Sequence, residues 1–357
     1  METTTSAGHW RILVTGASGF IGAHAIDYLS NNTIHEVVGI DSFCHKGTYS
    51  RLDEIPGIDG RLCMGEVQIF HHNLTAPIDP VLFHKMHSQH FDVILNFASN
   101  SAVERSMSDP GECWHNNCHL VYNMLEFARE IPNLKAFVQI STDEVYGDYG
   151  GKEEGFVEWD AINPSNPYAA SKAAQEALCI AYWRSYDLPI VIANTMNNIG
   201  EWQDAEKFVP RVIAQIHQGK KVYVYTDNEG NIGSRIYLDV KDHIRFLMEI
   251  IQHRSPARFS SGNFDRPDRW NVVGIEEFTN LEMAELIAEL MGQPLNYEFT
   301  PAKSARPGYD KRYLLNGDKL YDLLKSRGSQ RHTPIMHSLQ RIIKHTLSKP
   351  HWIEIDL

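Results

Sequence analysis

The segment TGASGFIG, residues 15–22, constrains the fold more than any other part of the sequence. It stands between an apolar β-type run and a stretch with helical periodicity, and its glycines are Gly16, Gly19 and Gly22. Glycine lets such a turn close and lets the backbone approach a pyrophosphate at the N-terminus of the helix. Glycine is common in turns of every kind, so a tight turn without a ligand is the alternative.

A second feature strengthens the nucleotide interpretation. The β-type run VVGID ends at Asp41, about twenty residues after the glycine turn. An acid at this place in a βαβ unit binds the ribose 2′-hydroxyl of NAD and would repel the 2′-phosphate of NADP. The pattern therefore predicts an NAD site.

β-type runs and helical stretches alternate along the first two hundred residues. Runs at 36–41, 91–99, 134–142 and 188–195 are separated by stretches that include helical patterns at 120–131 and 166–186. This alternation predicts an α/β fold of the Rossmann type, a doubly wound parallel sheet covered by helices on both faces.

The pattern loosens after about Asn197 and predicts a smaller mixed α/β lobe with helices at 208–220 and 280–293. We expect an NAD-binding domain at 1–196, to which 235–254 returns. We expect residues 197–234 and 255–357 to form the substrate-binding lobe.

Composition narrows the class of protein. A net charge of −12 argues against a nucleic-acid surface. The five cysteines include no CxxC pair, and no apolar run approaches the ~20 residues that span a bilayer. The polar first residues do not resemble a signal peptide, so we expect a soluble cytoplasmic protein. The eighteen histidines show no zinc-site spacing, and no metal is predicted.

Two adjacent acids, Asp143 and Glu144, follow the β-type run in STDEVYGDYG. They suit acid and base catalysis, because like charge and burial raise one of the two pKa values. The alternative is a structural cap, since Ser141 and Glu144 also fit the S/T-x-x-E capping box.

Tyr168 and Lys172 lie four residues apart in YAASK on a predicted helix, so both side chains share one face. A nearby ammonium stabilises a phenolate and makes the tyrosine usable as a base. In isolation, a half-buried Tyr beside a snorkelling Lys would be the better explanation of the pair, because that arrangement is common.

Four motifs together resemble the extended short-chain dehydrogenase/reductases: TGASGFIG, ISTDEVYG, NPYAASKA and RPGYDKRY. Within these, the chain is most similar to the nucleoside-diphosphate-sugar 4,6-dehydratases, especially the dTDP-glucose type. The motifs run in matching order from about Arg11 to Tyr313. NTMNNIGEWQDAEKFVP also resembles the substrate loop of that group, which carries a double Asn and then a Lys.

The resemblance implies a lyase that uses retained NAD and assigns Thr142, Tyr168 and Lys172 to oxidation of the C4 hydroxyl. Glu144 then takes the C5 proton while Asp143 protonates the departing C6 hydroxyl, and hydride return leaves a 4-keto-6-deoxy sugar. It also implies a homodimer through a four-helix seam formed by helices near 120–131 and 173–186.

Binding residues are carried over by position. For NAD they are Gly16, Gly19, Phe20, Ile21, Gly22, Asp41, Ser42, Asn73, Leu74, Ala98, Ser99, Asn117, Tyr168 and Lys172. For the sugar nucleotide they are Ser101, Thr142, Asn197, Lys207, Arg235, Asn271, Arg306 and Tyr309. Several of the basic residues could neutralise a diphosphate in this acidic protein, and Arg211 and Arg312 are further candidates.

The chain departs from the group's pattern at three places. Ser99 or Asn100 and Ser101 stand where an acid and a His are usual, and Tyr309 stands where a His is common. The segment SRIYLDV also lacks the acid–aromatic pair that often follows its arginine. The base and the sugar therefore stay open. An epimerase or decarboxylase with the same Tyr and Lys is one alternative, and a non-catalytic NAD-binding protein is another.

Overall fold

A computed structural model describes residues 8–44, 48–149, 151–227, 229–253, 260–261, 264–301, 310–329 and 332–352. The chain divides into two compact units. Unit 1 comprises Met1–Ser141, Ala170–Asn194 and Ile244–Trp270, and unit 2 comprises Thr142–Ala169, Thr195–His243 and Asn271–Leu357.

Unit 1 is built on a seven-stranded sheet with the order β12-β6-β5-β4-β1-β2-β3. Its strands are β1 (Arg11–Thr15), β2 (Glu36–Asp41), β3 (Val67–His71), β4 (Val93–Asn96), β5 (Ala136–Thr142), β6 (Ile190–Thr195) and β12 (Asp268–Val272). β1 pairs in parallel with β2 and β4, as do β2 with β3 and β4 with β5. The order 3-2-1-4-5-6 is that of the doubly wound dinucleotide-binding fold, and the predicted fold class is confirmed.

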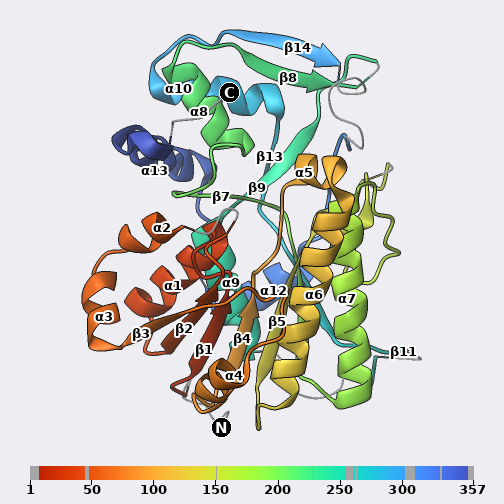
Figure 1. Cartoon of the computed structure of the whole chain (residues 1–357). Coiled ribbons are helices and arrows are strands. Elements are labelled where there is room, and N and C mark those ends of the chain that lie inside the picture. Colours follow the sequence, from red (N-terminus) through yellow and green to blue (C-terminus); the bar gives the residue numbers. More distant parts are fainter. Residues whose placement is uncertain are drawn as a thin grey trace. The chain divides into compact units, whose positions relative to one another are not determined.

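Apolar residues on helices cover this sheet. The helices that begin in unit 1 are α1 (Phe20–Asn32), α2 (Tyr49–Asp53), α3 (Ile58–Met64), α4 (Pro80–His87), α5 (Val103–Ser108) and α6 (Pro110–Arg129). Helix α7 (Pro167–Tyr186) belongs to unit 1 from Ala170 onward, and helix α9 (Val240–His253) belongs to it from Ile244 onward. Figure 1 shows α6 and α7 running side by side, and their Phe127, Cys179 and Trp183 pack into one buried cluster with Ile94 and Phe137 of the strands.

Unit 2 contains two small sheets. β9 (Ser234–Asp239) pairs antiparallel with β13 (Glu276–Thr279) and parallel with β7 (Asn197–Ile199). β8 (Val222–Thr226) pairs in parallel with β14 (Tyr297–Pro301). The 3₁₀ turn η1 (Asp143–Tyr146) follows β5. The other helices in the described part of unit 2 are α8 (Phe208–His217), α10 (Asn280–Met291), α12 (Asp318–Arg327), α13 (Ile335–Ser348) and η2 (Pro350–Trp352). A core made largely by α8, α10 and α13 holds this unit together.

The predicted β runs at 36–41, 91–99, 134–142 and 188–195 correspond to β2, β4, β5 and β6, and the predicted helices at 208–220 and 280–293 to α8 and α10. The sequence interpretation missed β12, which lies in a segment rich in polar and turn residues. In the segment 235–254, β9 pairs within unit 2, whereas the chain from Ile244 belongs to unit 1.

Among the described helices, none has the length and apolar character required to cross a bilayer. The minor two-residue strands β10 (Ser260–Ser261) and β11 (Phe264–Asp265) pair with each other.

Candidate active site

The glycine turn between β1 and α1 is sterically closed to larger residues. Gly16 has a φ of +64°, and a Cβ atom there would lie 3.0 Å from the backbone of Ala98. A Cβ atom on Gly22 would lie 1.9 Å from the carbonyl oxygen of Gly16. The backbone of this turn is therefore as compact as close approach by a pyrophosphate requires.

The N-terminus of α1 offers groups that suit a negatively charged ligand. Gly19 is the N-cap and provides no side chain to bond the first N–H groups of the helix. The hydroxyl oxygen of Ser18 in the turn is buried and has no hydrogen-bond partner among the described residues. Free N–H groups at a helix start, with the positive end of the dipole, fit the diphosphate of NAD.

Asp41 at the end of β2 holds the turn in place. One carboxylate oxygen accepts the Ser18 N–H at 2.9 Å, and the other accepts the Phe43 N–H at 2.8 Å. Each carboxylate oxygen has a further lone pair, so these bonds are compatible with the predicted contact to a ribose hydroxyl. That contact stays a prediction.

The loop after β4 is fastened to β1 and α6. The Ala98 N–H donates to the Thr15 hydroxyl at 3.1 Å. The Ser99 hydroxyl and the Asn100 N–H both donate to the side-chain oxygen of Asn117, at 3.1 and 2.8 Å. The serine-containing loop that departs from the resembled group is therefore an ordered part of unit 1.

The remaining predicted cofactor residues have local roles. The Ser42 hydroxyl accepts the Cys44 N–H at 3.3 Å, and the Asn73 side chain accepts from the N–H and hydroxyl of Thr75. Leu74 packs in the core of unit 1. Phe20 and Ile21 form the first turn of α1.

The two adjacent acids form η1 directly after β5. The Thr142 hydroxyl donates to one oxygen of Asp143 at 2.9 Å and accepts the Glu144 N–H at 3.3 Å. Asp143 is 4% exposed, and its second oxygen has no hydrogen-bond partner among the described residues. A buried oxygen of this kind can donate a proton when the carboxyl is neutral.

The capping-box alternative for Ser141 and Glu144 does not hold. Thr142 is the N-cap of η1, and the Ser141 hydroxyl donates to Glu176. Successive side chains of a strand point to opposite faces, so the Ser141 hydroxyl in β5 faces away from that of Thr142 and toward Glu176. The side chain of Glu144 is thereby left available for other contacts.

The protonation of Asp143 is set by its surroundings. Burial, followed by the negative charge of Glu144, raises the pKa of Asp143 to about 7, although the hydrogen bond from Thr142 and the charge of Arg235 act in the opposite direction. A carboxyl with this pKa is partly protonated at neutral pH, as a general acid requires.

Glu144 receives a hydrogen bond from outside η1. The side-chain N–H of Asn166 donates to its carboxylate at 3.0 Å, and the Tyr313 hydroxyl lies 3.5 Å from the same oxygen. A donor to a carboxylate favours its ionised form. The two neighbouring acids therefore occupy environments that favour opposite protonation states.

Tyr168 and Lys172 are buried, one turn apart on α7, as their spacing predicted. The Lys172 ammonium donates to the carbonyl oxygen of Ile140 in β5 at 2.9 Å. Burial lowers the pKa of Lys172 to about 8, and the charge of Glu176, one turn further along α7, opposes this effect. Lys172 therefore remains mostly charged at neutral pH and can stabilise a phenolate.

Glu176 is the centre of a buried polar cluster in unit 1. Its carboxylate accepts from the hydroxyl of Ser141, from the Asn194 amide at 2.8 Å and from the Arg269 guanidinium. Glu176 and Arg269 are 1% and 3% exposed. The cluster fixes a negative charge one helical turn from Lys172.

The predicted sugar-nucleotide residues are distributed over unit 2. Arg235 donates to the backbone carbonyls of Ser234, Asp310 and Lys311, and its guanidinium lies 4.7 Å from the ring centre of Tyr313. These contacts give Arg235 a structural task in addition to the predicted one.

Asn271 is fully buried and donates to the carbonyls of Phe156 and Asn316. Asn197 is the first residue of β7, and Lys207 is the N-cap of α8. Ser101 is exposed, and Arg306 and Tyr309 lie outside the described residues.

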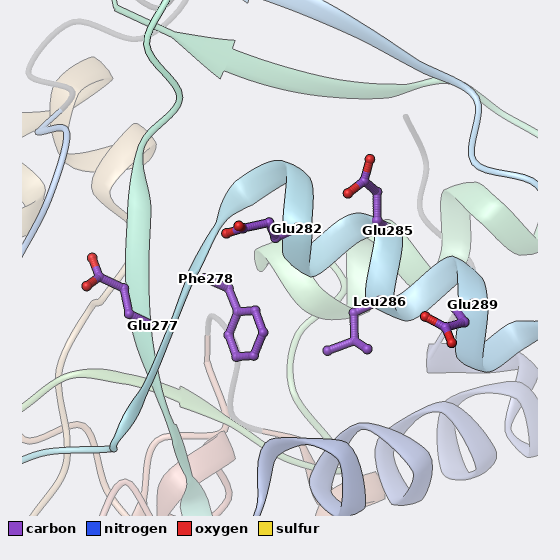
Figure 2. A pocket seen from close by; sticks show the side chains of 6 residues that line it. All are labelled: Glu277, Phe278, Glu282, Glu285, Leu286 and Glu289. Carbon is purple, nitrogen blue, oxygen red and sulfur yellow. The ribbon is translucent and has the colours of Figure 1, made fainter.

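Arg312, a further predicted diphosphate ligand, makes two hydrogen bonds of 2.6 Å to Glu277. Glu277 belongs to a pocket of about 360 Å³ lined by Glu277, Phe278, Glu282, Glu285, Leu286 and Glu289 (Figure 2). Four carboxylates in one lining would repel a diphosphate, so this pocket is not a candidate for the sugar-nucleotide site.

Among the described residues, His, Cys, Asp and Glu form no group of three that could hold a metal ion.

Sequence reasoning missed three residues of the site: Asn166, Glu176 and Arg269. Asn166 stands directly before Pro167, and Asn followed by Pro is a helix-start signal that could have drawn attention to it. Glu176 repeats the four-residue spacing of Tyr168 and Lys172. No local signal identifies Arg269, whose partner lies 93 residues away.

Comparisons with known proteins agree with this geometry. Residues 12–262 match the model of a family described as the NAD dependent epimerase/dehydratase family. A dTDP-glucose 4,6-dehydratase of Haemophilus influenzae is 33% identical over 332 residues, which cover 87% of this chain and 90% of that protein.

Two solved structures illustrate the likeness in fold. The dTDP-glucose 4,6-dehydratase of Bacillus anthracis in complex with NAD has a TM-score of 0.79 and 25% identity, with 96% of this chain and 98% of that chain covered. The UDP-glucuronic acid 4-epimerase of Bacillus cereus, with UDP-glucuronic acid and NAD, also has a TM-score of 0.79, at 24% identity and with 95% and 99% covered. The likeness to the epimerase shows the fold alone.

Proposed function

This chain belongs to the NAD dependent epimerase/dehydratase family, and we propose that it dehydrates a nucleoside-diphosphate hexose to the 4-keto-6-deoxy sugar. The observation that carries the proposal is the contrast between Asp143 and Glu144. Asp143 is buried with a pKa raised to about 7, and Glu144 accepts a hydrogen bond from Asn166. Elimination of water needs one protonated and one ionised carboxyl at the same site, and an epimerase has no such need.

The proposed roles follow the resemblance, and the hydrogen bonds and burial described above support them. The Tyr168 phenolate, supported by the Lys172 ammonium, takes the proton of the C4 hydroxyl. Once C4 is a ketone, the C5 proton is acidic and Glu144 removes it, while Asp143 gives its proton to the C6 hydroxyl, which leaves as water. The NAD that fits the glycine turn would accept the C4 hydride and return it to C6, while Glu144 gives its proton back to C5. The proton that Tyr168 gained balances the one that Asp143 gave up. Thr142 is positioned by its bond to Asp143 to orient the sugar.

We further assign the predicted NAD-binding residues from Gly16 to Asn117 to a cofactor site in unit 1. The assignment is supported by the closed turn at Gly16 and Gly22 and by the position of Asp41. We assign Ser101, Asn197, Lys207, Arg235, Asn271, Arg306 and Tyr309 to substrate binding, on the positions of their motifs. Removal of Lys207 by a Lys207→Met substitution should raise the substrate KM if the assignment is right.

A homodimer and a cytoplasmic location complete the proposal. Trp114 and Tyr122 on α6 are 52% and 47% exposed, and Ala177 and Ala181 are exposed on α7. Large aromatic and small apolar side chains on neighbouring helices suit packing against a second copy. The five free cysteines suit a reducing compartment. Sedimentation of Trp114→Glu against the unmodified protein would test the dimer.

A panel of nucleotide sugars, beginning with dTDP-glucose, tests the reaction directly. Mass spectrometry of the product separates the candidates: loss of one water indicates a dehydratase, unchanged mass with altered stereochemistry an epimerase, and loss of CO₂ a decarboxylase. Absence of any product across the panel would support a non-catalytic NAD-binding protein.

The variant Glu144→Gln isolates the base. Glutamine cannot take the C5 proton, so we expect dehydration to fall by roughly 10²–10⁴. Oxidation at C4 does not use Glu144, so reduction of bound NAD should remain visible at 340 nm after substrate is added. Unchanged dehydration would remove the dehydratase assignment.

A further inference from the structure

We propose that Asn166 is a positioning residue that fixes Glu144, in its ionised form, relative to the start of the helix that carries Tyr168. The inference rests on the proposed dehydration and identifies a residue to which the resemblance assigns no role. Asn166 and Glu144 are 22 positions apart in the chain and both lie in the Thr142–Ala169 segment of unit 2.

The orientation of the Asn166 amide is determined by its neighbours. Its side-chain oxygen accepts the N–H of Ala169 at 2.9 Å, in the first turn of α7. A backbone N–H can only donate, so the oxygen must face Ala169 and the nitrogen must face the other way. That nitrogen donates to Glu144 Oε2 at 3.0 Å. Asn166 is 5% exposed, so water contributes little around this bond.

The hydrogen bond from Asn166 favours the ionised form of Glu144, whereas the acidic residues around Glu144 disfavour it. Asp143 is the adjacent acid, and the carboxylate of Asp310 accepts the Tyr313 hydroxyl proton at 2.7 Å. That proton is therefore engaged away from Glu144, although the hydroxyl oxygen lies 3.5 Å from it. Arg235 supplies positive charge 4.7 Å from the centre of the Tyr313 ring. In this acidic setting, the Asn166 amide favours the charged form of Glu144 that removal of the C5 proton requires.

The same bond also fixes distance. Asn166 joins Glu144 to the first turn of α7, and Tyr168 follows two residues later on that turn. The group that takes the C4 hydroxyl proton and the group that takes the C5 proton are therefore connected through one buried amide. Small displacements of a base relative to its proton are costly in rate.

Two substitutions separate this role from simple capping. Asn166→Asp has the same shape and retains an oxygen for the Ala169 N–H, but it replaces the donor to Glu144 with a carboxylate oxygen. Asn166→Ser also retains a capping oxygen and is too short to reach Glu144 at the same time. Asp109→Ala is the control, because it removes the side-chain cap of another helix, α6, at Glu112 N–H.

We expect the dehydration rate to fall roughly 10²-fold or more in Asn166→Asp and roughly 10-fold in Asn166→Ser, from loss of a charge-assisted bond. Reduction of bound NAD on addition of substrate should stay within about 3-fold of the unmodified protein, since it does not use Glu144. The acid limb of the dehydration pH profile should move to higher pH in Asn166→Ser. Asp109→Ala should lower the melting temperature without changing the ratio of the two steps.

An equal effect of Asn166→Asp on both steps, or an unchanged pH profile in Asn166→Ser, would overturn the inference and leave Asn166 as a structural cap. If Asn166→Asp does not fold, Asn166→Ser decides the question alone. If the unmodified protein dehydrates no sugar, the proposed function has failed; if it does so and both variants match it, only this inference has failed.

Discussion

Asp143 and Glu176 are buried carboxyls that the protein treats in opposite ways. Asp143 accepts one side-chain hydrogen bond, from Thr142, and its other oxygen has no hydrogen-bond partner among the described residues. Glu176 accepts from Ser141, Asn194 and the Arg269 guanidinium. Their exposures, 4% and 1%, are almost the same.

The number and charge of the hydrogen-bond donors, rather than burial, therefore distinguish the surroundings of these two carboxyls. Without enough donors, burial raises the pKa of Asp143 to about 7. With three donors, one of them a guanidinium, the charge of Glu176 is compensated and can support Lys172. The environment of Asp143 suits proton donation and lowers the stability of the folded protein. The hydrogen bonds of Glu176 hold β5, β6, α7 and β12 together.

The largest effect should come from breaking the compensated pair. Arg269→Met keeps much of the side-chain volume but leaves Glu176 buried without its cation, so the free energy of unfolding should fall by about 3–5 kcal/mol. Urea denaturation with NAD present measures this change. Arg312→Met is the matched control, because Arg312 and Glu277 are 28% and 27% exposed and a pair of that kind contributes about 1 kcal/mol or less. Equal losses in the two variants would contradict the distinction drawn here.

At Asp143, by contrast, we expect a substitution to increase the free energy of unfolding. Its raised pKa means that the folded protein keeps a proton that the unfolded chain releases between about pH 4 and pH 7, so the native protein loses stability as the pH rises through that window. Asn cannot ionise, so Asp143→Asn should gain stability relative to the native protein by about 4 kcal/mol between pH 4 and pH 8. Dehydration should fall by roughly 10²–10⁴ in the same variant. A stability difference that does not vary with pH would show that Asp143 ionises normally.

The contrast between the two carboxyls also separates what the sequence could predict from what it could not. The glycine turn, the β runs and the Tyr168–Lys172 spacing are local patterns, and each was predicted from neighbouring residues. The acids Asp143 and Glu144 stand out in the sequence itself, but their unequal environments depend on Asn166, Tyr313 and Arg235.

Long-range contacts account for the rest. Glu176 looks like any acid on a helix until Arg269, 93 residues later, is brought to it by β12, a strand that the sequence interpretation missed. Ser141 was considered as an alternative cap because the S-x-x-E spacing fits, but strand β5 extends one residue further and turns its hydroxyl toward Glu176. Local motifs predict which residues are chemically active, whereas the partners that surround those residues come from the tertiary fold.

The smallest expected effect tests whether the charge of Glu176 influences oxidation at C4 through Lys172. Glu176 opposes the lowering of the Lys172 pKa, so Glu176→Gln should bring that pKa below about 8. Fewer Lys172 side chains are then charged near pH 8, and the phenolate of Tyr168 loses support.

In a Glu144→Gln background, reduction of bound NAD should therefore slow by at most roughly 10-fold at pH 8, corresponding to about one pKa unit. At pH 6.5 Lys172 is charged with either residue at 176, so the difference should shrink there. Glu176→Asp is the control that keeps the charge while disturbing the packing. If Glu176→Gln and Glu176→Asp slow NAD reduction equally at both pH values, Glu176 acts on Lys172 through packing alone. The charge of Glu176 then has a structural role and no role in the reaction.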